Sequence, residues 1–283
     1  IPLLPYNSLI SVNSIQLSTT VDHIRRTKNI GPIIQRFRVN GGDLLLRRKA
    51  VHSSLIRRSS NVTQGNFDKL APKDLRILFE EYDSEFFEGF LQDMLTKLDS
   101  PPISFRLSKR MTSAAGATKY RRLPVSSGET GAYKPLFELV IAIDLLFQQF
   151  KSRDRLVHVN GLECSDRLEA LQRVFEHELT HILELMVWES SSCKKSRFHK
   201  MAQHIFGHTE FTHQLITRKE MASSEHNIQV GSEVAFEFHS LRYEGVVIRI
   251  TKRATVLVKS TEGVLYTDEL RYSKYYMPIS ELH

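Results

Sequence analysis

The stretch VFEHELTHILELMVW at residues 174–188 decides what kind of protein this chain can be. It holds two histidines four residues apart, His177 and His181, with Glu178 directly after the first. Residues four apart on an α-helix differ by roughly 40° around the axis and lie one turn above each other. On a helix the two imidazoles can therefore converge on a single ion.

These residue types indicate a specific chemistry. Imidazole is a common zinc ligand, and zinc lowers the pKa of a coordinated water from about 15.7 toward 7. Glu178 lies about 100° further round the helix, too far to join the two histidines comfortably as a ligand. It is placed instead to accept a proton from that water as a general base. His-Glu-x-x-His on a helix is the signature of zinc metallopeptidases.

The same motif also has a simpler interpretation. Two histidines on a half-buried amphipathic helix, beside a solvated glutamate, would bind no metal. The motif alone favours zinc, because apolar residues at helical spacing would hold it in a core. These residues are Leu171, Val174, Phe175, Leu179, Ile182, Leu183 and Met186.

The segments around the motif predict an α+β domain. Pro72 begins a long amphipathic pattern that predicts a helix, which Gly89 can bend or split. Alternation predicts a strand over 103–107, the stretch 114–122 predicts a turn into a second strand, and 137–143 predicts a buried strand. The motif helix is predicted from about 166 to 188, capped by Ser165 or Asp166, and a further helix over 197–206 is predicted to end at Gly207.

Two other regions flank this domain. Residues 1–68 contain ten Lys and Arg against three Asp, which accounts for the whole net charge of +7. They show no sustained period, so we expect a basic, disordered arm that could contact nucleic acid. After a polar linker at 217–227, residues 228–283 hold five short strand patterns separated by turn signals, which predicts a small all-β SH3-like barrel.

Composition favours a globular protein in a reducing compartment. The longest apolar run, LVIAIDLLF at 139–147, is about half of the ~20 residues that a membrane span needs. The first residues lack the basic start of a signal peptide. Two cysteines, Cys164 and Cys193, argue against a disulfide scaffold. We therefore expect a cytoplasmic protein, associated with the nucleoid or chromatin if its arm binds DNA, and no membrane partner.

The order of FEEYDSEFFEGFL, a strand, the AGAT turn, an apolar strand and HELTH resembles the SprT-like zinc metallopeptidases, the family that includes Spartan. Residues 198–215, which end in FGHTEFTHQL, resemble the end of that family's metal domain. The resemblance covers about residues 72–216. It implies a zincin-like protease domain over 69–216 that binds Zn²⁺. Known members cleave proteins crosslinked to DNA or are linked to DNA repair, which implies DNA-bound protein substrates.

The third ligand departs from the family pattern. The family usually supplies a histidine four residues before an aromatic, and counting back from Phe198 reaches Lys194, a poor ligand because it is protonated at neutral pH. Cys193 is the adjacent residue, and thiolate is a good zinc ligand, so family-like geometry makes Cys193 the first choice. Glu184 is the second choice, although orienting a histidine or the water suits it better. His199, His204, His208 and His213 remain open, with His208 first among them.

Gly116 marks a further candidate position. In SprT-like proteins this region leads into the edge strand beside the cleft, where a substrate backbone could pair. An ordinary hairpin glycine is an equally good interpretation.

Together these patterns predict a zinc-dependent endopeptidase with His177, His181 and Cys193 on the metal and Glu178 as general base. The rival is a non-catalytic DNA- or chromatin-binding protein whose zinc is structural, which would show a closed set of four ligands. The substrate and the oligomeric state are left open.

Overall fold

The computed structural model of the chain describes residues 29–124, 133–148, 150, 156–215, 220, 222–223 and 226–283. It divides between residues 215 and 216 into two compact units. This boundary lies one residue from the predicted end of the metal domain at 216. Most of the predicted linker at 217–227 lies outside the described residues. None of the helices in the described part of the chain combines the length and hydropathy needed to cross a bilayer.

The first two helices of the described part of the chain overturn the expectation of a disordered arm. Helix α2 spans Gly31–Phe37 and α3 spans Gly41–Arg58. Their inward side chains belong to the main core and are at most 2% exposed: Ile33, Phe37, Val51 and Leu55. Each pair is four residues apart, the spacing of one helical face. The arm prediction is therefore wrong for residues 31–58, and residues 1–28 lie outside the described residues.

The helix predicted from Pro72 is present, and it divides at the expected glycine. Helix α4 spans Pro72–Phe87 and α5 spans Phe90–Lys97. Between them Gly89 has a φ of 82°, a left-handed conformation that glycine adopts readily. The carboxylate of Asp83 then accepts the backbone N–H groups of Leu91 at 2.8 Å and Gln92 at 3.2 Å, which satisfies the start of α5.

A three-stranded sheet forms one side of the first unit. It consists of β1 (Ser104–Ser108), β2 (Gly116–Pro124) and β3 (Tyr133–Ala142) in the order β1-β3-β2. Strand β1 is parallel to β3, and β2 is antiparallel to it. These three strands confirm the strands predicted from the sequence. Among the described strands, β2 pairs with β3 alone, so its other edge has no strand partner.

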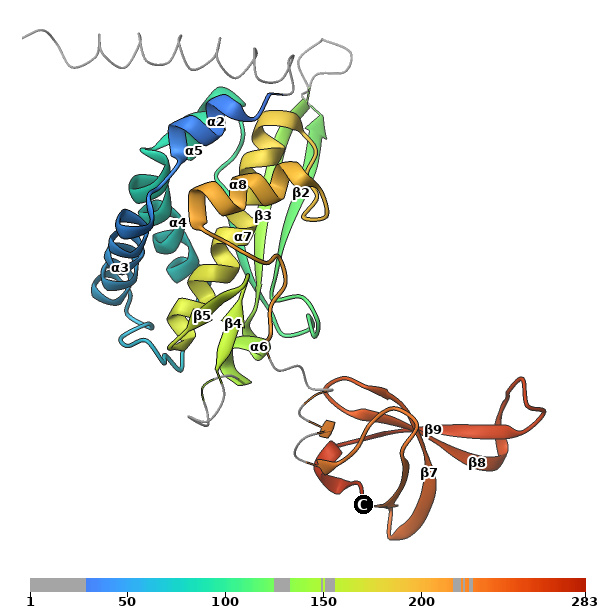
Figure 1. Ribbon diagram of the computed structural model, residues 1–283. Coiled ribbons are helices and arrows are strands. Elements are labelled where there is room, and N and C mark those ends of the chain that lie inside the picture. Colours follow the sequence, from blue (N-terminus) through green and yellow to red (C-terminus); the bar gives the residue numbers. More distant parts are fainter. Residues whose placement is uncertain are drawn as a thin grey trace, which may run out of the picture. The chain divides into compact units, whose positions relative to one another are not determined.

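Among the described residues, helices cover one face of the sheet. The ring centroid of Phe105 on β1 lies 5.9 Å from that of Phe79 on α4 and 6.3 Å from that of Phe175 on α7 (Arg167–Trp188). Both helices therefore pack on the same face of the sheet (Figure 1). On the opposite face Arg106 and Lys119 each form a 3.0 Å ion pair with Glu138. These three charged side chains are 25–46% exposed, as is common on the outer face of a sheet with antiparallel pairing.

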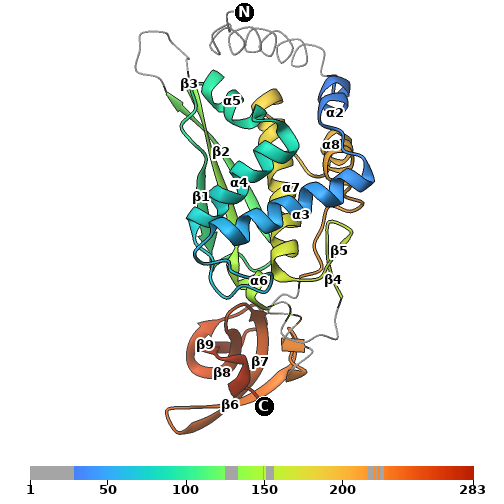
Figure 2. The ribbon, with the colours of Figure 1, turned by 90° about the vertical axis from the view of Figure 1, so that its left-hand side faces the viewer.

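Helix α7 (Arg167–Trp188) is the central element of the first unit and carries the motif. As predicted, Asp166 caps it by accepting the backbone N–H of Glu169 at 2.8 Å. In Figure 1 the helix lies between α3 and the sheet, and in Figure 2 α3 crosses in front of it. The remaining elements of this unit are α6 (Ile143–Gln148), β4 (Val157–Val159), β5 (Leu162–Cys164) and α8 (Ser196–Phe206). Helix α8 ends at the predicted Gly207, which has a φ of 66°.

The second unit is a four-stranded antiparallel sheet rather than the predicted closed barrel. Its strands are β6 (Glu233–Phe238), β7 (Leu241–Ile250), β8 (Ala254–Leu265) and β9 (Arg271–Met277), in that order, followed by the short helix η1 (Ile279–Glu281). No strand pairing closes the described part of this sheet. At the outer edge of β6, Ala235 exchanges two backbone hydrogen bonds with His283, of 2.9 and 3.0 Å.

The fifth predicted strand is absent because the signal at Glu262 and Gly263 is not a turn between two strands. It lies inside β8, at a shift of register against β9. A Cβ atom at Gly263 would approach the carbonyl oxygen of Tyr272 to 2.3 Å, so the glycine allows the two backbones to meet closely. A close backbone contact thus produced the same sequence signal as a turn.

Candidate metal centre

The two motif histidines lie side by side on α7, as the spacing predicts. Both are half-buried, and their ring centroids are 5.0 Å apart. The ring of Phe198 on α8 packs against both of them, 4.8 Å from His177 and 4.5 Å from His181. Phe198 is completely buried, so it restricts the rotation of both imidazoles.

Cys193 joins the two histidines. Helix α7 ends at Trp188, and the next residue, Glu189, has a left-handed φ of 54°; the loop that follows returns beside the helix before α8 begins. The ligand atoms of His177, His181 and Cys193 all lie within 4.8 Å of one another. A tetrahedral zinc with bonds of about 2.0–2.3 Å separates its ligands by roughly 3.5 Å, so small side-chain movements would let all three donors bind one ion.

Both imidazoles are in the form that a metal requires. Burial lowers the pKa of His177 to about 3, and the neighbouring His181 adds to this effect. Burial also lowers the pKa of His181. Both rings are therefore neutral near pH 7, and a neutral imidazole keeps one nitrogen lone pair for a metal.

Glu184, the alternative third ligand, does not belong to the ligand group, whose third member is Cys193. Its carboxylate is fully buried and accepts Arg197 Nε at 2.6 Å and Ser191 Oγ at 2.5 Å. Ser191 Oγ in turn lies 2.6 Å from His181 Nδ1. Glu184 thus reaches a motif histidine through Ser191, consistent with the orienting role that the sequence suggested for it.

Glu178 is buried beside strand β2 and is 4% exposed. Thr118 Oγ1 donates to its Oε2 at 2.8 Å. A Cβ atom at Gly116 would lie only 2.6 Å from Glu178 Oε1 and 2.9 Å from a methyl group of Val174. Glycine at position 116 is therefore what allows the strand to approach this carboxylate, and it is more than a hairpin residue.

The environment of Glu178 favours its protonated form. Burial raises the pKa of this carboxyl to about 7, against the opposing effect of the Thr118 hydrogen bond. A general base works best when its pKa lies near the operating pH, because it can then both accept and release the proton. Sequence reasoning identified Glu178 but not Thr118, which follows the noted Gly116 by two residues on the same face of β2.

The other candidate histidines have different partners. His199 Nε2 lies 2.6 Å from the carbonyl oxygen of Cys193, and its ring stacks on Phe211 at 3.7 Å. His204 Nδ1 lies 2.6 Å from the carbonyl oxygen of Lys200, and His213 Nε2 lies 2.8 Å from that of Ser113. None of the three belongs to the ligand group found among the described residues.

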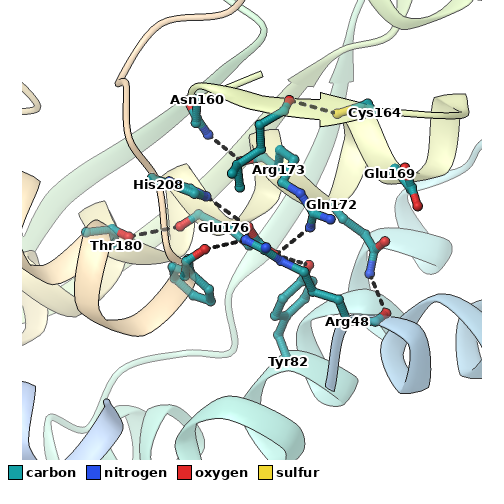
Figure 3. Close-up of polar contacts among 12 residues, drawn as sticks. Arg48, Tyr82, Asn160, Cys164, Glu169, Gln172, Arg173, Glu176, Thr180 and His208 are labelled. Carbon is teal, nitrogen blue, oxygen red and sulfur yellow. Dashed lines mark hydrogen bonds and ion pairs between the residues drawn. The ribbon is translucent and has the colours of Figure 1, made fainter. Parts of the chain in front are cut away.

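His208 belongs to a second buried cluster, which sequence reasoning did not predict. Figure 3 shows Arg48, Tyr82, Arg173 and His208 pointing toward Glu176. The two Glu176 oxygens accept Arg48 at 2.8 and 2.7 Å, Tyr82 Oη at 2.8 Å, Arg173 at 2.9 Å and His208 Nε2 at 2.8 Å. This cluster joins α3, α4, α7 and the turn after α8. The residue that could have indicated this cluster is Arg48, which lies in a segment with the composition of a solvated arm.

In comparisons with known proteins, no family model matched the chain, and no curated protein and no solved structure matched it either. The functional argument therefore depends on the geometry of the site.

Proposed function

We propose that this chain is a zinc-dependent endopeptidase of the SprT-like type. The observation that carries the proposal is the convergence of His177, His181 and Cys193 within 4.8 Å, with the buried Glu178 next to His177 on helix α7. His177, His181 and Cys193 would hold the ion, and Glu178 would act as the general base. A divalent ion bound there would act as a Lewis acid toward a peptide carbonyl and would make water more acidic.

Glu178 supplies the proton transfers that peptide hydrolysis needs. Attack on the scissile carbonyl requires water to lose a proton, and departure of the amine requires a proton to be delivered. A carboxyl with a pKa near 7 can do both in turn. The Thr118 hydroxyl, 2.8 Å from Oε2, holds the carboxylate in one orientation and leaves Oε1 for the proton.

The number of donors favours this function over a structural zinc site. Structural sites are closed by four protein ligands, whereas catalytic sites keep one position open. Within the described residues the group has three members. A purely structural site also gives no reason for a buried carboxylate beside the first ligand.

The proposed substrates are proteins, including proteins bound to DNA. The proposal of DNA-bound substrates rests on the resemblance alone, because several cations of the predicted basic arm form contacts within the fold and are not available to bind DNA. Arg48 is buried against Glu176, and Arg58 pairs with Glu80 and Glu81. Arg47 donates to the carbonyl oxygen of Glu85.

The test measures zinc content and cleavage of fluorescent casein for wild type, Glu178→Gln and Cys193→Ala. Lys194→Ala is the matched control, since Lys194 is the exposed neighbour of Cys193. We expect about one zinc per chain in wild type, zinc without cleavage in Glu178→Gln, and weakened zinc binding in Cys193→Ala. If the wild type binds stoichiometric zinc but neither it nor any of the variants cleaves casein, with or without single-stranded DNA, the structural site would be favoured. A wild-type chain that binds no zinc would contradict both.

A further inference from the structure

A continuous chain of polar contacts connects His181 with the loop that carries Cys193. It begins at His181 Nδ1, passes through Ser191 Oγ at 2.6 Å, and reaches Glu184 Oε2 after a further 2.5 Å. The same Glu184 oxygen accepts the backbone N–H of Ser192 at 3.3 Å. A buried carboxylate is costly unless its partners compensate it, and here the partners lie in the loop and at the start of α8.

We propose that Glu184 and Ser191 are positioning residues that assemble the metal centre before the metal binds. Glu184, acting through Ser191, sets which nitrogen of His181 is free, and the same carboxylate fixes the loop that presents Cys193. This inference rests on the proposed metal site at His177, His181 and Cys193.

The first half of the inference follows from the direction of the hydrogen bonds. Glu184 accepts Arg197 Nε on Oε1 at 2.6 Å and the backbone N–H of Ser192 on Oε2 at 3.3 Å, so both carboxylate oxygens act as acceptors. Ser191 has one proton and donates it to Glu184. Its lone pair must then accept from His181, so Nδ1 carries the ring proton. The lone pair of His181 is thereby left on Nε2, the nitrogen that a metal would use.

The second half follows from how firmly the loop is held. Arg197 also donates to the carbonyl oxygen of Ser190 at 2.6 Å, and its guanidinium lies 4.4 Å from the ring of Trp188. On the other side of the loop, His199 holds the carbonyl oxygen of Cys193 at 2.6 Å. Contacts therefore fix consecutive loop residues from Ser190 to Cys193. A loop fixed in advance loses less entropy when its thiol binds an ion.

The inference can be tested first without any metal. Long-range ¹H–¹⁵N NMR of the histidine side chains reports which ring nitrogen carries the proton. In the metal-free wild type we expect His181 in the Nδ1–H form, retained in Ser191→Thr and lost to a tautomer mixture in Ser191→Ala. A His181 found as the Nε2–H tautomer in the wild type would overturn the inference, whatever the variants do.

Zinc affinity, measured by competition with a chromophoric chelator, gives the second readout. Loss of an outer partner of a ligating histidine typically weakens metal binding 10–100-fold, so we expect that loss in Ser191→Ala and near wild-type affinity in Ser191→Thr. Ser190→Ala is the matched control, because Ser190 contributes a backbone carbonyl that the substitution keeps. Unchanged affinity in Ser191→Ala would overturn the inference and leave the proposed function intact. A wild type that binds no zinc would instead remove the proposed function itself.

Discussion

Two glutamates on helix α7 have the same chemistry and nearly the same burial, yet opposite environments. Glu176 is fully buried and Glu178 is 4% exposed. Two residues apart on a helix, they face different sides of it. Glu176 faces Arg48, Arg173, Tyr82 and His208 on the side of the N-terminal helices. Glu178 faces strand β2 and accepts the hydroxyl of Thr118.

The difference between them is the supply of nearby cations. Burial would raise the pKa of Glu176, but Arg173 and Arg48 outweigh it and hold the pKa well below its usual range. Burial acts on Glu178 without such compensation, and its pKa rises to about 7. One carboxylate is therefore permanently charged and connects helices, while the other can exchange a proton near neutral pH. Pairs of carboxyls whose environments separate their pKa values are typical of divided structural and catalytic roles.

The largest expected effect comes from neutralising the proton acceptor. Glu178→Gln should lower casein cleavage by roughly 10²–10⁴-fold, because a general base typically contributes that much. Zinc content, measured by mass spectrometry, should stay at the wild-type level. Loss of zinc in this variant would assign Glu178 to the ligands instead, and retained cleavage would remove it from the reaction.

Breaking the cation cluster should affect stability instead. Arg48→Met leaves Glu176 short of a buried partner, and removing one member of a buried ion pair typically costs about 3–5 kcal/mol. Urea unfolding of the metal-free protein measures this cost. Arg58→Met is the control, since Arg58 forms partly exposed pairs with Glu80 and Glu81, each worth about 0–1 kcal/mol. Equal effects of the two substitutions would contradict the structural role of the Glu176 cluster.

The pH dependence of stability should isolate Glu178. Its pKa rises from 4.5 to about 7 on folding, so between these values the folded state binds more protons than the unfolded state. Stability from this group is complete below pH 4.5 and is lost as the pH rises through 7. In metal-free protein, the unfolding free energy of wild type minus that of Glu178→Gln should fall by about 3 kcal/mol between pH 4 and pH 8. A constant difference would show that Glu178 is not perturbed.

The smallest effect is expected at Thr118. Its hydrogen bond favours the ionised form of Glu178, so Thr118→Val should raise the pKa of that carboxyl further and shift the acidic limb of the cleavage profile to higher pH. A hydrogen bond to a charged group contributes about 1.5–3 kcal/mol. We expect a fraction of this energy to affect catalysis, so that Thr118→Val cleaves casein several-fold more slowly than wild type. Thr118→Ser keeps the hydroxyl and should restore the profile. Identical profiles for the valine and serine variants would show that the contact is incidental.

The placement of the motif residues on one helix was predictable from the sequence, because its signal is local. His177, Glu178 and His181 lie within five residues, and helical geometry alone determines their relative directions. Cys193 needed a loop that returns to the helix, and the structure brings it there. The mixed α+β class and the split at Gly89 were also confirmed.

The structural half was not predictable, because its signal is spread over the chain. Arg48 and Glu176 are 128 residues apart, and an Arg-rich segment with short apolar patches has the composition of a solvated arm. Only the partners of α3 reveal that it is folded. The prediction of a fifth strand in the second unit failed for a related reason, since Gly263 allows a close backbone contact inside β8 and does not mark a turn.

The central claim is that one ion is held by His177, His181 and Cys193, and zinc K-edge X-ray absorption tests it most directly. The chain has two cysteines, so a zinc–sulfur bond can be assigned by substitution. The wild type should show one sulfur at about 2.3 Å with nitrogen or oxygen at about 2.0–2.2 Å, and Cys193→Ala should lose the sulfur. A zinc shell without sulfur in the wild type, or a sulfur that persists in Cys193→Ala, would contradict the account.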